Sequence, residues 1–234
     1  MRVLVTRPSA DSTRTAALLE ARGHASVIAP VTAIVARPFP AEIATTPGLS
    51  ASLATSAHAF EGAAHWAEAI RALPVYCVGW RTAEAATAAG FGVREPAEPD
   101  AAALANRLAA EPAGHFLYLA GADRKPHLER ALAAQGHHVA LAVTYEAVAV
   151  ASLPPIAKEA LASGGLDAVL HYSRRHADLF KALTEAAGLG LMAAQLAHIC
   201  LSMDVAEPLQ WVYPNLRIAE QPDEQALMAA LEHM

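Results

Sequence analysis

The sequence is poor in cysteine and has no long apolar segment. Its 234 residues include two cysteines, Cys77 and Cys200, each within a short apolar run. We therefore expect two buried, reduced thiols and no disulfide framework. No apolar run approaches the roughly 20 residues that a membrane-spanning helix requires. The first residues, MRVLVTRP, are typical of a short strand ended by proline and not of an export signal. These absences predict a soluble protein of the cytoplasm with no membrane partner.

Basic residues and catalytic fingerprints are also scarce. Lys and Arg number 17 against 23 Asp and Glu, a formal charge of −6, which argues against general nucleic-acid binding. The chain has no GxGxxG, GxxxxGK[ST], GxSxG or HExxH motif, so nucleotide-binding, nucleophilic-enzyme and metal-enzyme functions lose their main sequence support. The 11 histidines show no metal-ligand spacing, and we expect His137, His138, His171 and His176 in loops or at the surface. No metal and no cofactor are predicted.

Apolar residues are plentiful, at 54% of the chain, which is enough for sizeable cores in one large domain or two small ones. β-branched apolar strands alternate with Ala-rich helices along the whole chain, and glycine follows several of the helices. This alternation predicts an α/β fold of parallel sheets with right-handed crossovers. The expected elements include one strand over residues 26–35 and one helix that is capped by Ser56 and extends to residue 72.

The sequence contains a weak internal repeat. LEARGH at residues 19–24 matches LAAQGH at residues 132–137, an offset of 113. Each match follows a strand, a polar loop and a helix, and precedes a β-branched strand. A second unit of two strands and two helices contains Ser56 and recurs around Ser173, so the chain reads a, b, a′, b′. The sequence leaves two domain arrangements open: a with b followed by a′ with b′, or b with a′ inserted between a and b′.

Cations and hydroxyls collect in the segments that follow strands. In parallel α/β sheets, ligands bind at the carboxyl ends of the strands. Six of the 17 basic residues lie in such segments: Arg7, Arg81, Arg124, Lys125, Arg174 and Arg175. Four hydroxyls lie at strand-to-helix turns, where they cap a helix or help to bind an anion: Ser56, Thr82, Ser173 and Ser202. This distribution predicts an anionic ligand, the alternative being solvated loop charges.

The run at residues 139–150, VALAVTYEAVAV, is apolar and β-branched apart from Thr144, Tyr145 and Glu146. A similar run lies at residues 27–37, after the first copy of the repeat. In the inserted arrangement both runs cross between two lobes, and we expect Tyr145 at the mouth of the cleft between them. The alternative is a strand tyrosine with a packed ring and a solvated hydroxyl.

Five short motifs, in their order, resemble uroporphyrinogen-III synthases: VTRP at residues 5–8, TS at 55–56, VGWRTA at 78–83, VTY at 143–145 and YSRR at 172–175. The resemblance extends over essentially the whole chain. It implies two flavodoxin-like parallel α/β lobes joined by a two-stranded β ladder, with one lobe inserted into the other. The first lobe would be residues 1–36 with 150–234 and the inserted lobe residues 37–149. The crossing strands would be about 27–37 and 139–150.

The resemblance also implies an activity. These enzymes are hydro-lyases of tetrapyrrole biosynthesis that use no cofactor. They cyclise hydroxymethylbilane, a linear tetrapyrrole with eight carboxylates, to uroporphyrinogen III with loss of water and inversion of ring D. By resemblance, Tyr145 is catalytic and donates a hydrogen bond to the departing hydroxyl. The implied substrate-binding residues are Arg7, Ser56, Thr82, Ser173, Arg174 and Ser202. The enzyme is expected to be a monomer.

One turn departs from the family pattern. Residues 202–205 read SMDV, so the glycine and the threonine of the second family turn are replaced, and Asp204 adds a negative charge. An alternative function is therefore a non-catalytic, two-lobed module of the same fold that binds a small ligand or regulates. A flavodoxin-like or periplasmic-type small-ligand binder is a third option, and the lack of a signal sequence disfavours its exported version.

Overall fold

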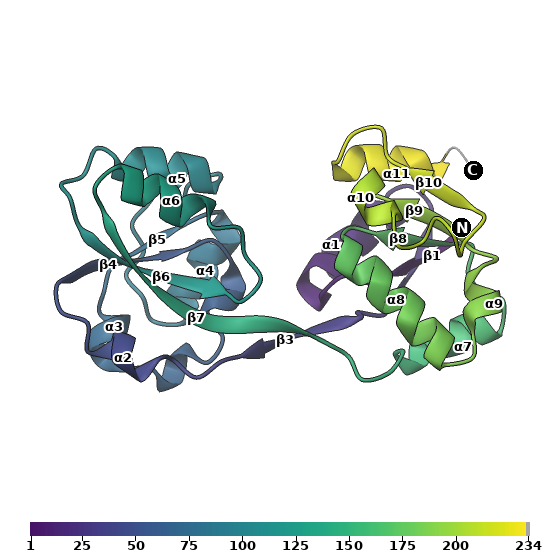
Figure 1. Cartoon of the computed structure of the whole chain (residues 1–234), viewed down its shortest axis with the longest axis horizontal. Coiled ribbons are helices and arrows are strands. Elements are labelled where there is room, and N and C mark those ends of the chain that lie inside the picture. Colours follow the sequence, from purple (N-terminus) through teal and green to yellow (C-terminus); the bar gives the residue numbers. More distant parts are fainter. Residues whose placement is uncertain (233–234) are drawn as a thin grey trace. The chain divides into compact units, whose positions relative to one another are not determined.

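The structure is a computed structural model that describes residues 1–232, apart from the side chains of residues 9 and 10. The chain divides into two compact units (Figure 1). Unit 1 comprises Met1–Ala33 with Val148–Met234, and unit 2 comprises Ile34–Ala147. None of the helices in the described residues combines the length and the apolar character needed to cross a membrane.

Unit 1 is built on a five-stranded sheet of order β10-β9-β8-β1-β2, and its strand pairs are parallel. The strands are β1 (Arg2–Val5), β2 (Ala25–Ile28), β8 (Ala168–His171), β9 (Ala197–Cys200) and β10 (Leu216–Ile218). Successive residues of β1 enter two different cores, because side chains alternate between the faces of a sheet. One core contains α7 (Pro155–Ala162), α8 (Arg174–Ala186), α9 (Gly190–Ala193) and α10 (Met203–Ala206). The other contains α1 (Ser9–Glu20) and α11 (Glu224–Glu232).

Unit 2 is organised in the same way around the sheet β3-β7-β6-β4-β5. Its strands are β3 (Thr32–Ala36), which begins in unit 1, β4 (Leu49–Ala54), β5 (Val75–Cys77), β6 (His115–Gly121) and β7 (His138–Ala149). One core receives the 3₁₀ turns η1 (Ala57–Phe60) and η2 (Ala63–His65) with α3 (Glu68–Arg71) and α4 (Trp80–Ala88). The other receives α5 (Ala101–Leu108) and α6 (His127–Ala134).

The strand orders agree with the internal repeat. Parallel bridges from Val75 to Val93 and from Val78 to Glu98 place residues 93–98 beside β5, where unit 1 has β10 beside β9. With that segment as a fifth strand, β7-β6-β4-β5 follows the same order as β2-β1-β8-β9. The sheet of unit 1 combines the repeat units a and b′, and that of unit 2 combines a′ and b. The predicted fold class, two parallel α/β lobes, is confirmed.

Strands β3 and β7 are hydrogen-bonded neighbours. The Arg37 N–H donates to the Thr144 carbonyl at 2.7 Å, and the Val150 N–H donates to the Val31 carbonyl at 3.1 Å. Residue numbers therefore rise on one strand as they fall on the other, so this pair is antiparallel. The chain passes between the units along both strands.

Two expected elements are wrong. The strand predicted over residues 26–35 is two strands, β2 and β3. Ala29 and Val31 donate hydrogen bonds to the carbonyls of Val5 and Thr6, but Pro30 between them has no N–H to donate, so the strand is interrupted there. The helix predicted from Ser56 to residue 72 is η1, η2 and α3, because Gly62 adopts φ +82°, which a continuing helix cannot contain. Two short helices, α2 (Ala41–Ala44) and α9, were not expected.

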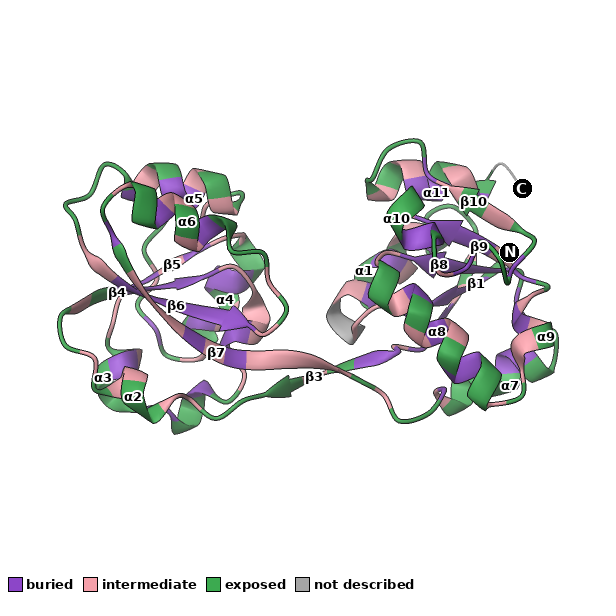
Figure 2. Cartoon of the chain, in the orientation of Figure 1, coloured by how far each residue is buried: buried purple, intermediate pink, exposed green. Residues whose placement is uncertain are grey.

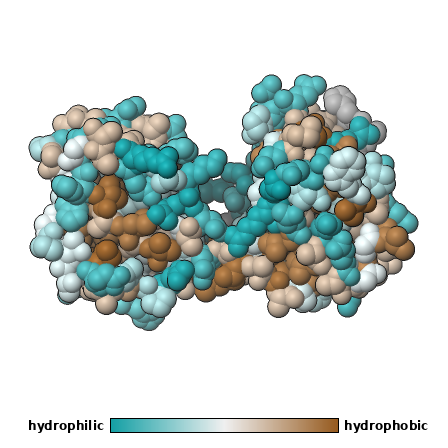
Figure 3. All heavy atoms as spheres, in the orientation of Figure 1, coloured by the Kyte–Doolittle hydropathy of each residue, from teal (hydrophilic) through white to brown (hydrophobic). Residues whose placement is uncertain are grey.

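Burial follows the same plan in both units. Figure 2 shows buried residues concentrated in the sheet strands, and exposed residues on the outward sides of the helices. Cys77 and Cys200 are both buried and unpaired, as predicted, and burial raises the pKa of each thiol to about 12. In the view of Figure 3, apolar side chains of unit 2 gather over β7. Much of β7 is only half-buried.

Candidate functional site

In unit 1, the predicted site residues follow the carboxyl ends of adjacent strands. The registers Val5 to Leu170 and His171 to Cys200 keep the ends of β1, β8 and β9 level with one another. The segments that leave these ends carry four of the predicted residues: Arg7, Ser173, Arg174 and Ser202. The structure therefore brings these four to one edge of one sheet.

The serines at this edge are helix caps. Ser173 accepts a hydrogen bond from the His176 N–H at 3.2 Å at the start of α8, and Ser202 accepts one from the Val205 N–H at 3.4 Å at the start of α10. A capping hydroxyl takes up one of the free N–H groups of its helix, and the remaining N–H groups can still face an anion. The capping role predicted for both serines is confirmed.

Arg7 already has partners within unit 1. Its guanidinium lies 3.9 Å from the ring centroid of Tyr172, donates to Glu224 at 3.2 Å and lies 3.4 Å from Asp11. Glu224 also accepts the Tyr172 hydroxyl at 2.8 Å and the Thr15 hydroxyl at 3.1 Å. Burial and this carboxylate raise the pKa of Tyr172 to about 12, so the phenol stays protonated. A ligand carboxylate at Arg7 must therefore share the guanidinium with Glu224.

Arg174, the first residue of α8, is exposed and also paired. It contacts the Glu207 carboxylate and lies 3.6 Å from Asp204. The hydrogen bond to Glu207 raises the pKa of Arg174 further above its usual range. Asp204, in the turn that departs from the family pattern, thus faces a cation that the resemblance assigns to substrate.

In unit 2, three predicted residues lie at the corresponding edge. Ser56 follows β4 and caps η1 by accepting the His58 N–H at 3.3 Å. Thr82 is buried in the first turn of α4 and is not the cap residue of that helix, contrary to the capping interpretation of this hydroxyl. Tyr145 lies on β7 opposite Gly121, the last residue of β6, at a shift in the strand register.

The Tyr145 hydroxyl is available to a ligand. The side chain is half-buried, yet its hydroxyl makes no hydrogen bond within the described part of the chain. By contrast, the hydroxyls of Tyr118, Tyr172 and Tyr213 are each bonded to a neighbouring side chain. The Tyr145 ring lies directly over Gly121, where an added Cβ would be 2.7 Å from Cζ of the tyrosine. Glycine at this position is therefore what allows the ring to occupy its place.

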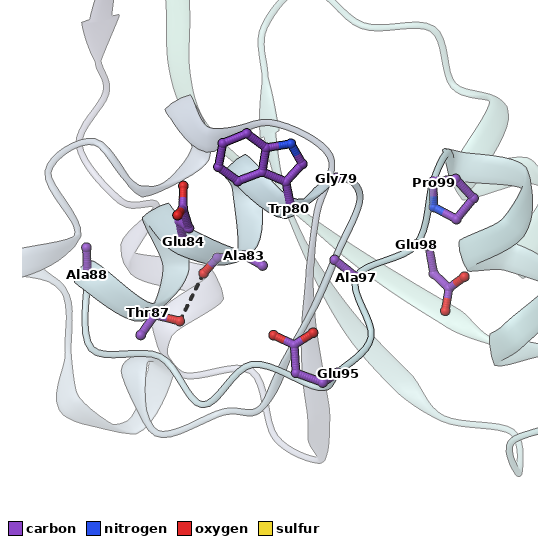
Figure 4. A pocket seen from close by; sticks show the side chains of 10 residues that line it. All are labelled: Gly79, Trp80, Ala83, Glu84, Thr87, Ala88, Glu95, Ala97, Glu98 and Pro99. Atoms are coloured by element: carbon purple, nitrogen blue, oxygen red, sulfur yellow. Dashed lines mark hydrogen bonds between the residues drawn. The ribbon is translucent and has the colours of Figure 1, made fainter.

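A pocket of about 920 Å³ lies beside α4 in unit 2 (Figure 4). Glu84 on α4 and Glu95 in the segment that follows the helix lie on its two sides, with the exposed Trp80 ring at one end. Glu98 also lines the pocket and pairs with Arg107 at 3.0 Å. This acidic lining disfavours a polyanionic ligand in the pocket, which separates it from the predicted anion site.

The histidine prediction is wrong for His171, which is buried in β8. His137 lies in the loop between α6 and β7, as predicted, although its side chain is buried. His137 accepts the Gly114 N–H at 3.1 Å and lies 3.0 Å from the Leu108 carbonyl. Nε2 of His171 lies 3.1 Å from Nδ1 of His198. Nε2 of His198 lies 3.0 Å from the Ala193 carbonyl oxygen. His171 and His198 are thus paired inside the fold, while Nδ1 of His171 is buried with no hydrogen-bond partner within the described residues. Among the described residues, no group of three or more His, Cys, Asp or Glu could hold a metal ion.

The profile of the uroporphyrinogen-III synthase HemD family matches residues 13–229, almost the entire chain. The chain belongs to this family. Family membership places the protein in tetrapyrrole synthesis, with a small-molecule tetrapyrrole as its substrate. No curated protein sequence matches the chain.

Two solved uroporphyrinogen III synthases share the fold. The enzyme from Helicobacter pylori is 17% identical with a TM-score of 0.60, and the match covers 100% of both chains. A mutant enzyme from the extreme thermophile Thermus thermophilus is 20% identical with a TM-score of 0.51, and the match covers 100% of this chain and 98% of that one. At these identities the likeness concerns the fold, two α/β lobes in each case.

Sequence reasoning missed several residues of these clusters. Glu224 joins Arg7 although 217 positions separate them, and no local pattern in the sequence indicates this contact. Gly121 and His58, the neighbours of Tyr145, were also missed. The register of β6 against β7 and a strand-to-turn contact bring them there.

Proposed function

We propose that the protein is a hydro-lyase that cyclises hydroxymethylbilane to uroporphyrinogen III with loss of water and inversion of ring D. The unbonded, half-buried Tyr145 hydroxyl at the carboxyl edge of the unit 2 sheet carries the proposal within this family. As the pyrrole electrons of ring A expel the terminal hydroxyl, the phenol donates a hydrogen bond to the departing oxygen, and water leaves. A phenol, with a usual pKa of about 10, is protonated at neutral pH and can serve as this donor.

The ring inversion follows from the cation that remains. Its exocyclic carbon is attacked by the substituted carbon of ring D, which gives a spiro intermediate. Fragmentation and reclosure then join ring D in the opposite sense. These steps use only the substrate and the Tyr145 phenol. The protein's task is to hold the bilane so that the substituted carbon of ring D reacts first.

The substrate's eight carboxylates call for donors at both sheet edges. We propose that Arg7, Ser173, Arg174 and Ser202 of unit 1, and Ser56 and Thr82 of unit 2, supply them. Charge-assisted hydrogen bonds of this kind contribute about 1.5–3 kcal/mol each, so a few suffice for binding. Arg7 fits this role least directly, because Glu224 and Asp11 already engage it.

The decisive experiment supplies freshly generated hydroxymethylbilane and separates the uroporphyrin isomers after oxidation. Uroporphyrin III is the expected product. Uroporphyrin I alone, the isomer that forms by unassisted ring closure, would overturn the proposal and favour a non-catalytic binding module.

We also propose that the protein works in the cytoplasm as a monomer. Its two buried, unpaired thiols suit a reducing compartment. Light scattering coupled to size-exclusion chromatography tests the monomer. A dimer mass at working concentrations would contradict it.

Glu207→Gln is expected to lower the KM for hydroxymethylbilane by up to about 5-fold without changing kcat, because exposed ion pairs contribute at most about 1 kcal/mol. The change frees Arg174 from a competing carboxylate. Glu185→Gln serves as the control. Glu185 lies on α8, the helix of Arg174, and the substitution makes the same charge change at an exposed residue that does not contact Arg174. Equal KM values for both variants would remove Arg174 from the substrate-binding set.

Gly121→Ala is expected to reduce kcat about 10-fold, because an ångström-scale displacement of a catalytic group is costly. The added Cβ would lie 2.7 Å from Tyr145 Cζ and 2.9 Å from its hydroxyl, so the ring must move. Gly92→Ala is the control, since a Cβ there meets nothing within 4 Å. Steady-state kinetics with thermal unfolding checks the result. Wild-type kcat in Gly121→Ala would show that the ring position does not matter.

A further inference from the structure

The imidazole ring of His58 lies beside the phenol ring of Tyr145. The two ring centroids are 5.7 Å apart, with the planes inclined by 49°. On its other side, His58 Nδ1 lies 2.6 Å from Oε1 of Glu61. A carboxylate, an imidazole and a phenol therefore lie in succession at the carboxyl edge of the unit 2 sheet.

The backbone holds this arrangement in place. His58 lies in η1, whose start is capped by Ser56 through the His58 N–H. The Thr144 hydroxyl, buried next to Tyr145 in sequence, donates to the Ala59 carbonyl at 2.9 Å and ties the turn to β7. Phe60 packs into the core of unit 2 on the same turn. The position of His58 relative to Tyr145 is thus set by the Ser56 cap before it and by buried contacts of Ala59 and Phe60 after it.

We propose that His58, oriented by Glu61, is a positioning residue that returns a proton to Tyr145 during each catalytic cycle. The proposal rests on the dehydration proposed above. The imidazole makes no direct hydrogen bond to the Tyr145 hydroxyl, so the proton passes from His58 to the phenol oxygen through one bridging water molecule. Glu61 engages Nδ1 of His58 and leaves Nε2 as the nitrogen that can exchange a proton, as carboxylates do for histidines in other proton-transfer sites.

The proton balance closes within one turnover. When the C–O bond of the hydroxymethyl group breaks, the oxygen leaves with its own hydrogen and the proton of Tyr145, as water. The Tyr145 oxygen then takes a proton from the His58 imidazolium. At the end of the reaction, ring D regains aromaticity by releasing one proton, which restores the imidazolium. No oxidant, reductant or co-reactant is needed.

The elements around His58 carry further titratable groups. The elements packed on η1 are α4, β6 and β7. Their titratable residues are Arg81 and Glu84 on α4, His115 and Tyr118 on β6, and His138, Tyr145 and Glu146 on β7. Within the described residues, the ring of Tyr145 and the carboxylate of Glu61 are the contacts of the imidazole.

The test measures kcat against pH for wild type, His58→Gln and Glu61→Gln, with uroporphyrin III as product. In wild type, kcat should fall on the basic side of the pH profile, because the proposed cycle draws on the His58 imidazolium. His58→Gln should lower kcat at neutral pH about 10-fold and abolish this limb of the profile. Glu61→Gln should also lower kcat, because the imidazole loses the carboxylate that orients it.

His65→Gln is the matched control, because His65 is an exposed histidine of the neighbouring turn η2. It should keep both the rate and the pH profile. A structural role alone would lower kcat in His58→Gln at all pH values and leave the shape of the profile unchanged, which would overturn the proposal. A wild type that makes no uroporphyrin III at any pH would instead overturn the proposed function. The two failures are therefore distinct.

Discussion

Replacing Tyr145 with phenylalanine is expected to lower kcat about 100-fold, at the lower end of what a general acid contributes. The variant loses only the hydroxyl, which has no partner among the described residues, so folding stability should stay within about 0.5 kcal/mol of wild type. KM should change little, since the phenol acts on the departing oxygen and not on the substrate carboxylates. Single-turnover kinetics with thermal unfolding separates these quantities.

Tyr76→Phe provides the control for this change. Tyr76 lies on β5 of the same unit, and Arg107 lies 5.0 Å from its ring centroid, a contact that phenylalanine can keep. We expect wild-type kinetics from it. If Tyr145→Phe also retained the wild-type kcat, the phenol would have no part in water loss, and the interpretation of Tyr145 as a packed strand tyrosine would hold.

Much of the architecture could be predicted because its signals are local. β-branched strands, Ala-rich helices and the glycines after them recur within a few residues of one another, and these produced the strand and helix order. The predicted helix from Ser56 to residue 72 failed for a local reason of another kind. Helix propensity suited the segment, but Gly62 adopts a left-handed conformation there and divides it into short turns.

The edges of the sheets were also predictable, because ligand-binding segments follow the carboxyl ends of parallel strands. This rule selected Arg7, Ser56, Ser173 and Ser202 without knowledge of their neighbours. It could not show that Arg7 and Arg174 are paired with carboxylates of their own unit. The pairs with Glu224 and Asp204 join residues that are remote in sequence, and only the packing of the helices creates them.

The buried histidines were the least predictable feature. An imidazole is polar, so a surface position is the default expectation. In unit 1, His171 and His198 bond to each other, and the His198 ring stacks on Tyr213 with centroids 3.9 Å apart. Neutral imidazoles with such partners behave as core residues. The registers of β8 and β9, which no sequence pattern specifies, bring the pair together.

This pair leads to a second large effect, a loss of stability in mild acid. Burial lowers the pKa of His198 to about 4, and burial together with the charge of His198 lowers that of His171 well below its usual range. Burial likewise lowers the pKa of His176 to about 4. A histidine in the unfolded chain has a pKa of about 6.5. Between about pH 4 and pH 6.5 the unfolded chain therefore binds more protons than the folded chain does.

Because the folded state holds these rings neutral, their stabilising contribution is complete above about pH 6.5 and is lost as the pH falls toward about 4. For His198 alone the loss amounts to about 3 kcal/mol, since each unit of pKa difference corresponds to about 1.4 kcal/mol. That is a large part of the stability of a typical domain. Unit 1 is therefore expected to open in mild acid before its carboxylates are protonated.

Hydrogen exchange at the amides of β8 and β9, corrected for its intrinsic pH dependence, measures the opening free energy of unit 1. Between about pH 6 and pH 5, His198→Asn should reduce the pH slope of this free energy by about 1 kcal/mol per pH unit. The slope is the informative quantity, because lost stacking on Tyr213 lowers stability equally at every pH. His127→Asn, at an exposed histidine of unit 2, should leave the slope unchanged. An unchanged slope in His198→Asn would show that His198 takes up no proton when unit 1 opens, and would contradict the prediction.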